Sequence, residues 1–213
     1  MRKILFTLAI VPFVFMSNFA QAEYEGTTVG LSIGQFAAVA SGKETLDGVS
    51  TITTQDGAFK DSAKSIFVEV DLGRVSVGLD HILEAIESPE NTNAVNGSTN
   101  TAKVEIDGVI NLYATIDVIA GLYLKAGFTQ AKITSLEKVT TNSQTNGTVG
   151  DQDIDGYTVG FGYKHDLDNG FQIRAEVNAS EFDNFSVTDD SGDKYDFTDI
   201  YSARGIISIA KTF

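Results

Sequence analysis

The chain has 213 residues, no cysteine and a formal net charge of −14 at pH 7. The absence of cysteine excludes a disulfide scaffold and any thiol chemistry. The acidic balance argues against nucleic acid as a partner and against a polybasic protein of the membrane surface. The length suits a single domain after an export signal.

The N-terminus has the three parts of such a signal. A basic start is followed by an apolar stretch over residues 4–15, and Ala20 and Ala22 frame a small-x-small cleavage site. The apolar stretch is shorter than the roughly 20 residues that a membrane-spanning helix needs. We therefore expect a cleaved signal peptide over residues 1–22 and one domain over residues 23–213.

The rest of the chain repeats a period-two alternation of apolar and polar residues over segments of about 10 residues, which is typical of transmembrane barrel strands. The phase breaks at Gln35-Phe36, where we expect a β-bulge. The alternating segments are 28–36, 64–72, 75–83, 103–116, 120–133, 156–164, 171–180 and 200–213.

The connections between these segments alternate between short and long. Gly73-Arg74 matches a two-residue type II′ turn, residue parity favours a three-residue loop over 117–119, and a third short connection covers 166–170. Outer-membrane barrels have this asymmetry of short periplasmic turns and long extracellular loops. The sequence thus predicts an all-β fold, a closed antiparallel transmembrane barrel of eight strands. A soluble periplasmic barrel, with its apolar face inward, is the alternative. The long connections are 37–63, 84–102, 134–155 and 183–199.

Charged residues fall at the positions that should face the lumen. Eight strands leave an interior just wide enough for side chains, and buried charges must pair. The mixed signs therefore predict a network of ion pairs that plugs the lumen, with a narrow gated ion path as the alternative. The inward set is Glu69, Asp71, Asp80, Glu105, Asp107, Lys125, Lys164, Arg174, Glu176 and Arg204.

Two histidines are the candidates for catalysis. Asp80 and His81 are adjacent, but parity puts His81 on the lipid side while Asp80 faces inward. His165 is expected at the periplasmic rim beside Asp166. A nucleophile, a base and an orienting acid need to be within hydrogen-bond reach, and the sequence contains no such pattern. We expect no enzyme, with a lipid-modifying enzyme as the alternative.

An acidic motif ends the third long connection. Asp151, Asp153 and Asp155 precede Gly156, as in the first half of a calcium loop. An EF-hand would need Glu at the twelfth position, where this chain has Gly162. We expect no cofactor and interpret the motif as solvated charge, with loop-bound Ca²⁺ or Mg²⁺, shared with anionic lipopolysaccharide, as the alternative. A second acidic loop holds Asp189, Asp190, Asp193 and Asp196.

The whole mature chain resembles the OmpA/OmpX-like superfamily of eight-stranded outer-membrane β-barrels. The resemblance rests on the alternating approach to the terminal Phe213, on Asn111-Leu112-Tyr113 and on the Gly-aromatic alternation of residues 157–163. Lys211 departs from the apolar residue usual near the end of the last strand.

This resemblance implies a place in the cell outer membrane and contact with outer-membrane lipid and lipopolysaccharide. It also implies that the barrel-assembly machinery reads Phe213 during biogenesis. We expect a monomer with a structural or surface-interaction role, and a small porin-like channel for ions or solutes as the alternative.

Overall fold

The computed structural model describes residues 25–45, 52–89, 91–95, 98–140, 150–188 and 192–213. The predicted signal peptide, residues 1–22, lies outside the described residues. Within the described part of the chain, no helix combines the length and the apolar character needed to cross a bilayer.

The described chain consists almost entirely of β-strands. One 3₁₀ turn, η1 (Asp168–Gly170), interrupts them. The strands are β1 (Gly26–Thr45), β2 (Ile52–Leu72), β3 (Val75–Ile82), β4 (Ile86–Glu87), β5 (Asn91–Val95), β6 (Ser98–Ile119), β7 (Leu122–Thr140), β8 (Gln152–Asp166), β9 (Phe171–Phe182), β10 (Phe185–Thr188) and β11 (Lys194–Thr212).

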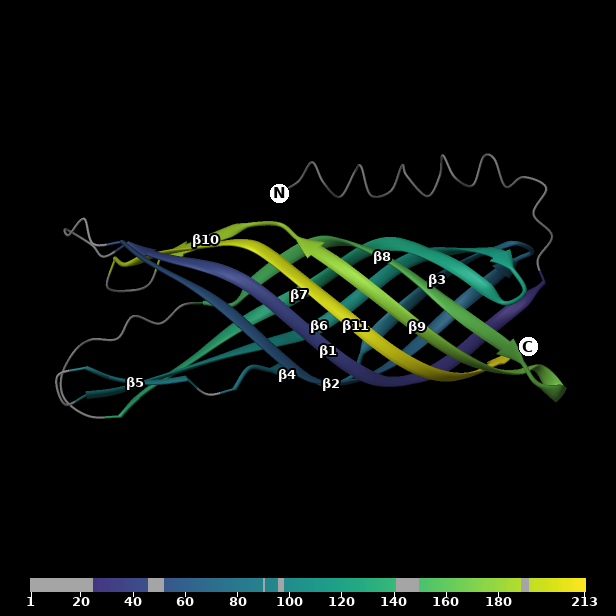
Figure 1. Cartoon of the computed structure of the whole chain (residues 1–213), viewed down its shortest axis with the longest axis horizontal. Helices are drawn as coiled ribbons and strands as arrows, with labels where there is room; N and C mark the ends of the chain where they lie inside the picture. The colour runs from purple at the N-terminus through teal and green to yellow at the C-terminus, as the bar shows by residue number, and fades with distance from the viewer. Residues whose placement is uncertain (1–24, 46–51, 90, 96–97, 141–149, 189–191) are drawn as a thin grey trace.

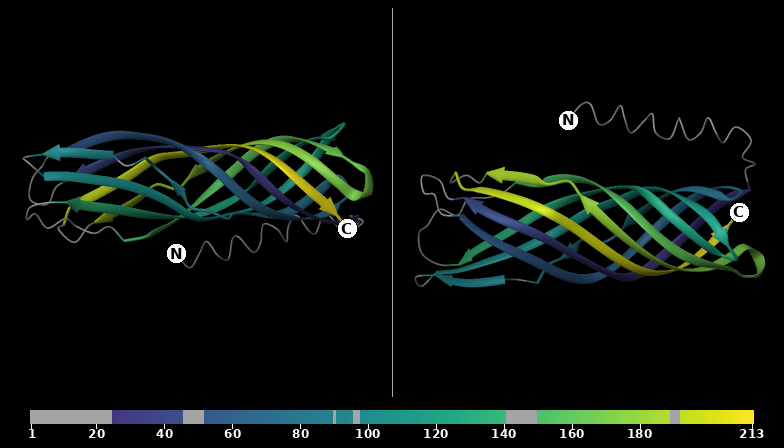
Figure 2. Two further views of the ribbon diagram at one scale, coloured as in Figure 1. Left: turned by 90° about the horizontal axis from the view of Figure 1, so that it is seen from below. Right: turned by 45° about the horizontal axis from the view of Figure 1, so that its top comes forward.

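Eight of these strands close into an antiparallel ring in the order β1-β2-β3-β6-β7-β8-β9-β11. The ring closes because β1 pairs with β11, from Thr28↔Thr212 outward. Beyond the end of β3, the short strands β4 and β5 pair with β6 in its stead. Beyond the end of β9, β10 likewise pairs with β11. Figures 1 and 2 show the resulting long, tilted barrel. The predicted fold class is confirmed.

The alternation puts apolar side chains on the outside. On β11, Ile207 and Ile209 are more than half exposed whereas Ser208 is buried, and the other strands repeat this pattern. A soluble barrel would have the opposite sidedness, because its apolar residues would fill the core. Aromatic residues lie near both edges of the outer apolar band, Tyr157 and Tyr201 on one side and Phe171 and Phe213 on the other, as in the girdles of transmembrane barrels.

The three short connections lie at one end, with the C-terminus (Figure 1). Gly73 has φ +76°, as the first central residue of a II′ turn requires. The three-residue loop predicted for 117–119 is wrong. The turn is Ala120-Gly121, with φ of +43° and +84°, and an irregularity in register around Val118 reconciles the two faces.

The predicted bulge at Gln35-Phe36 is also wrong. The alternation continues through both residues, with Gln35 outside and Phe36 buried, and the register of β1 with β11 shifts only between Val39 and Ser41. A bulge occurs instead on β6 between Asp107 and Ile110, where Gly108 has φ +58°. This bulge reverses the phase of every β6 residue before it.

The long connections are mostly strand rather than loop. The β2–β3 pairing ends at Ser65↔Ile82 and the β8–β9 pairing ends at Gly156↔Phe182. Beyond these points the described strands form two sheets, one of β4 to β8 and the other of β10, β11, β1 and β2 (Figure 1). An apolar core lies between the inner faces of the two sheets. Its buried members are Phe36, Ala38, Ala63, Ile82, Ile86, Ile106, Val109, Ala131, Ile154, Phe182 and Ile200.

Candidate functional site: the barrel lumen

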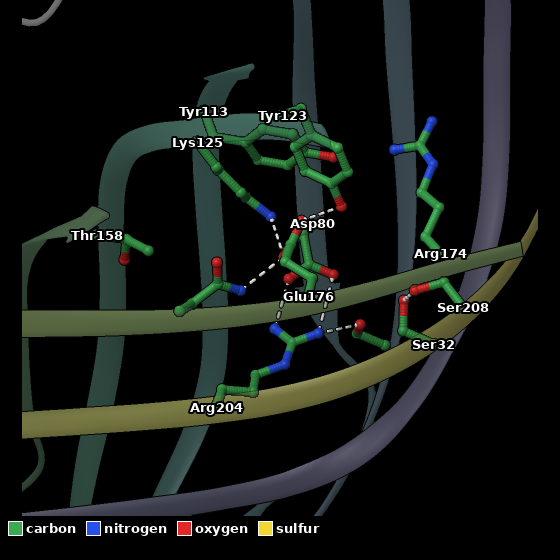
Figure 3. Close-up of polar contacts among 12 residues, drawn as sticks. Ser32, Asp80, Tyr113, Tyr123, Lys125, Thr158, Arg174, Glu176, Arg204 and Ser208 are labelled. Atoms are coloured by element: carbon green, nitrogen blue, oxygen red, sulfur yellow. Dashed lines mark hydrogen bonds and ion pairs between the residues drawn. The ribbon is translucent and has the colours of Figure 1, made fainter. Parts of the chain in front are cut away.

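Three buried ion pairs cross the lumen. The Arg174 guanidinium of β9 meets Glu69 of β2 with two parallel contacts, Nη1–Oε1 at 2.8 Å and Nη2–Oε2 at 2.7 Å. Two further pairs, Lys125–Glu176 at 2.9 Å and Arg204–Asp80 at 2.5 Å, link β7 with β9 and β11 with β3 (Figure 3). Each pair therefore joins strands that are far apart in the sequence.

Neutral donors also bond two of these carboxylates, Glu69 and Glu176. Tyr113 Oη donates to Glu69 at 2.9 Å. Glu176 accepts from Tyr123 Oη at 2.8 Å and from Asn178 Nδ2 at 2.6 Å. Such donors are needed because a buried charge is stabilised only when its hydrogen-bonding capacity is also met.

The aromatic rings of the network lie against glycines of the neighbouring strands. Tyr113 is the cross-strand partner of Gly78, where an added Cβ would come within 2.6 Å of Tyr113 Cζ. Tyr123 lies in the same way against Gly162, where an added Cβ would overlap the Tyr123 ring. Because glycine has no side chain at these two positions, the rings can fold across the lumen. The centroid of the Tyr113 ring lies 3.7 Å from Lys125 Nζ, in a cation–π contact.

Hydroxyl groups border the charged layer on both sides. On the periplasmic side Ser32 bonds Ser208 at 2.8 Å. On the other side, Thr158 Oγ1 bonds Thr129 at 2.5 Å and Ser180 at 2.6 Å. Further toward the extracellular end, the apolar core between the two sheets fills the lumen. The interior is thus layered, with polar groups in the membrane half and apolar groups above them.

The free space inside the charged layer is small. The cavity bounded by Asp80, Tyr123, Lys125, Arg174 and Glu176 measures about 10 Å³. That volume is at or just below what a single water molecule requires. The side chains themselves fill this cross-section of the barrel.

The predicted inward residues do not all join this layer. Asp71 lies lower, where Thr28 and Ser76 each donate to it at 2.7 Å. Lys164 pairs with Asp117 at 2.8 Å at the periplasmic rim.

The inward placement of Glu105 and Asp107 is wrong. The bulge at Gly108 turns Ile106 inward, into the apolar core, so its two neighbours lie on the outer face. The sequence signal for this was weak, because both phases of residues 103–107 contain apolar residues.

The acidic motif is part of strand β8 and the residue before it. Asp151, Asp153 and Asp155 are all exposed at alternate positions, so they extend along one face and do not converge. Asp151 instead contacts Lys132, and Asp155 accepts from Gln130 at 3.0 Å. Within the described ranges no three His, Asp or Glu side chains gather as metal ligands would. Asp189 and Asp190 lie outside the described residues.

The two histidines lie outside the lumen. His81 is on the outer side of β3, and its Nδ1 is 3.2 Å from the Val109 carbonyl oxygen. His165 is exposed near the periplasmic end of β8.

The last residue is tied to the first strand. Phe213 N–H donates to Thr27 O at 2.9 Å, and Thr27 N–H donates to Phe213 O at 3.3 Å. Lys211, the departure from the resembled pattern, lies with Nζ 5.1 Å from the Phe171 ring centroid and 5.2 Å from that of Phe213. Two aromatic faces at the interface thus accommodate the charge that an apolar residue would avoid.

Sequence reasoning missed two features of the lumen. Parity puts Tyr113 and Tyr123 on the lumen side, but it does not show that their hydroxyls donate to the carboxylates. The apolar upper layer was missed because Phe36, Ile86 and Phe182 stand at or next to the ends of the long connections, beside polar or charged residues. Their parity relative to the neighbouring strands was the available signal.

Together, the closed eight-stranded ring, the apolar outer band and the polar lower lumen define a transmembrane β-barrel of the outer membrane. The family described as "outer membrane protein beta-barrel domain" matches residues 6–202, and the chain belongs to this family. No curated protein matched the chain.

Solved structures agree with the fold. Outer membrane protein OprG from Pseudomonas aeruginosa is similar with a TM-score of 0.58 and 14% identity, over 91% of this chain and 98% of that one. The outer membrane protease OmpT from Escherichia coli is similar with a TM-score of 0.52 and 8% identity, over 92% of this chain and 100% of that one. At these identities the likeness shows the fold alone.

Proposed function

We propose that this protein is a non-conducting, non-enzymatic outer-membrane barrel that presents its extracellular sheets for a structural or surface-interaction role. The observation that carries the proposal is the layer of three ion pairs around a space of about 10 Å³. A permeating ion would have to break these pairs, and each broken pair leaves an uncompensated buried charge. The apolar core above the layer is a second barrier, since it offers no polar group to replace the water around an ion.

The positions of the histidines support the absence of enzymatic activity. His81 lies on the outer side and contacts a backbone carbonyl, while His165 is at the opposite end of the barrel wall. A histidine-based triad or dyad would need one of them within hydrogen-bond reach of a nucleophile. The protease activity of OmpT stays with that protein, because 8% identity carries only the fold.

Planar-bilayer recording of the purified barrel tests the closed lumen. We expect wild-type protein to conduct rarely and the Arg174→Ala variant to conduct more often, because Glu69 is left without its guanidinium. Lys132→Ala is the matched control, since it removes an exposed cation from the Asp151 contact and should leave conductance unchanged. Steady conduction by the wild type, unaltered by Arg174→Ala, would overturn the proposal and support the small pore instead.

A further inference from the structure

The outer wall of the barrel carries a groove of about 860 Å³, within the size range of small-ligand sites. The groove follows two rows of outward residues that run across the strands rather than along them. The pairs Leu122↔Tyr163, Tyr163↔Ala175, Ala175↔Ile207, Ile207↔Ile33 and Ile33↔Lys64 form the first row.

The groove exists because side chains are small where the two rows meet the middle of the wall. The second row consists of the pairs Phe161↔Val177, Val177↔Gly205, Gly205↔Gln35 and Gln35↔Ser62. Gly205 has open space where a Cβ would be, and Ala175 in the first row adds only a methyl group. Larger apolar residues, among them Phe161, Val177 and Ile207, stand on either side. An apolar trough in a wall that faces hydrocarbon is shaped for a flexible apolar chain.

The end of the groove toward the extracellular sheets is polar and cationic. Lys64, Ser62 and Gln35 line this end. Lys64 Nζ donates to both Glu84 carboxylate oxygens, at 2.8 and 3.1 Å, and its side chain is 56% exposed, so one N–H remains available for another acceptor. Lys60 is exposed on the same face of β2, four residues closer to the extracellular end of the strand.

We propose that the groove binds one acyl chain of a phosphorylated outer-leaflet lipid, with the lipid phosphate at Lys64 and Lys60. The apolar length fits the chain. Lys64 at the extracellular end of the groove and Lys60, four residues beyond it on the same face of β2, supply two ammonium groups that complement a phosphate. The proposal rests on the membrane location, not on whether the lumen conducts.

Native mass spectrometry of protein extracted in mild detergent tests this site. Wild type should retain a lipid, and Gly205→Leu, which fills the trough, should lower the ratio of lipid-bound to lipid-free protein roughly tenfold, the loss expected when about two methylenes are displaced. Ala114→Leu is the control, because Ala114 is an outward residue of β6 away from the groove. Ala175→Leu repeats the test should Gly205→Leu fail to fold, as judged by the mobility of unheated samples in gel electrophoresis.

The phosphate is tested separately by adding phosphorylated lipid or the same lipid without its phosphate. Lys64→Gln should weaken retention of the phosphorylated lipid alone, and Glu84→Gln should strengthen it because a competing acceptor is lost. Lipid-free wild type, or equal retention by Gly205→Leu and Ala114→Leu, would overturn the site. Equal retention of the two lipids would overturn the phosphate contact. Unchanged conductance in Gly205→Leu would keep this result separate from the test of the lumen.

Discussion

At the scale of single residues, Glu69 and Glu176 of the lumen each combine a cationic partner with at least one neutral hydrogen-bond donor. Glu176 accepts hydrogen bonds from Lys125, Tyr123 and Asn178. Removal of the counter-ion of a buried carboxylate lowers the free energy of unfolding by roughly 3–5 kcal/mol. Removal of one of several neutral donors should lower it by less.

Tyr123→Phe tests the contribution of a neutral donor. It removes only the hydroxyl that donates to Glu176, so we expect the free energy of unfolding to fall by roughly 1.5–3 kcal/mol. The measurement is urea unfolding of the barrel in detergent micelles. Tyr163→Phe, on the lipid-facing side of β8, is the matched control and should change it by less than about 0.5 kcal/mol. Equal losses would show that the hydroxyl–carboxylate bond is not the cause.

A second residue-scale prediction concerns sidedness. Val77 is an outward residue of β3 paired with Ala114, midway along the apolar stretch of β6. Val77→Arg should therefore lower the free energy of unfolding by roughly 2–4 kcal/mol in lipid vesicles. Asp107→Arg, placed on the outer face beyond that stretch, should be tolerated. A large loss of unfolding free energy in Asp107→Arg would show that residue 107 faces inward and that the bulge does not turn it outward.

At the scale of elements, the alternation predicted the membrane halves of all eight strands, because lipid on one side and packed lumen on the other impose a strict period of two. It did not predict their extracellular halves, where water covers the outer face and Gly, Ser and Thr suffice. It also missed the β6 bulge, since a single inserted residue leaves apolar residues in either phase. The sequence predicted that lumen charges pair, but not which charges pair with one another, because which of them share a height depends on strand stagger.

Gly108→Val tests the bulge. A β-branched residue at φ +58° is strained, so we expect a loss of about 1–2 kcal/mol in the free energy of unfolding. Space is not the cause, because a Cβ there would meet nothing within 4 Å. Gly57→Val, at an exposed strand position without positive φ, is the control in the same unfolding assay. A loss at 57 as large as at 108 would assign the effect to glycine replacement in general.

The extracellular core yields a prediction of its own. Ile86 is 0% exposed between the two sheets, and Ile86→Ala should destabilise that region by roughly 2–5 kcal/mol. Hydrogen exchange should then speed up in the outer part of β6, while the membrane part of the strand stays protected. Leu83→Ala, at an exposed site nearby, should leave both parts unchanged. Uniform protection in Ile86→Ala would show that the apolar layer does not act as a unit.

At the scale of the whole molecule, Phe213 links the fold to its biogenesis. The resemblance assigns the terminal aromatic to recognition by the barrel-assembly machinery, and the structure leaves its ring exposed at the periplasmic rim. Deletion of Phe213 should lower the amount of folded barrel in cells, measured by heat-modifiable gel mobility, while refolding into detergent proceeds nearly as before. Lys211→Leu, which keeps the terminal ring, is the control. Undiminished cellular yield without Phe213 would leave that residue only an anchoring role.

The closure of the ring also has a consequence for the order of folding. Thr28 and Thr212 share a hydrogen bond although they are 184 residues apart, and β1 pairs with β11 along most of its length. The remaining neighbours in the ring are hairpins that close locally, so this one seam carries the longest chain separation in the fold, and contacts of that kind form slowly. Until the last strand leaves the export channel, β1 has an open edge that can pair with another chain. The nascent chain must therefore be kept from pairing with other copies of itself until β11 is available to close the ring.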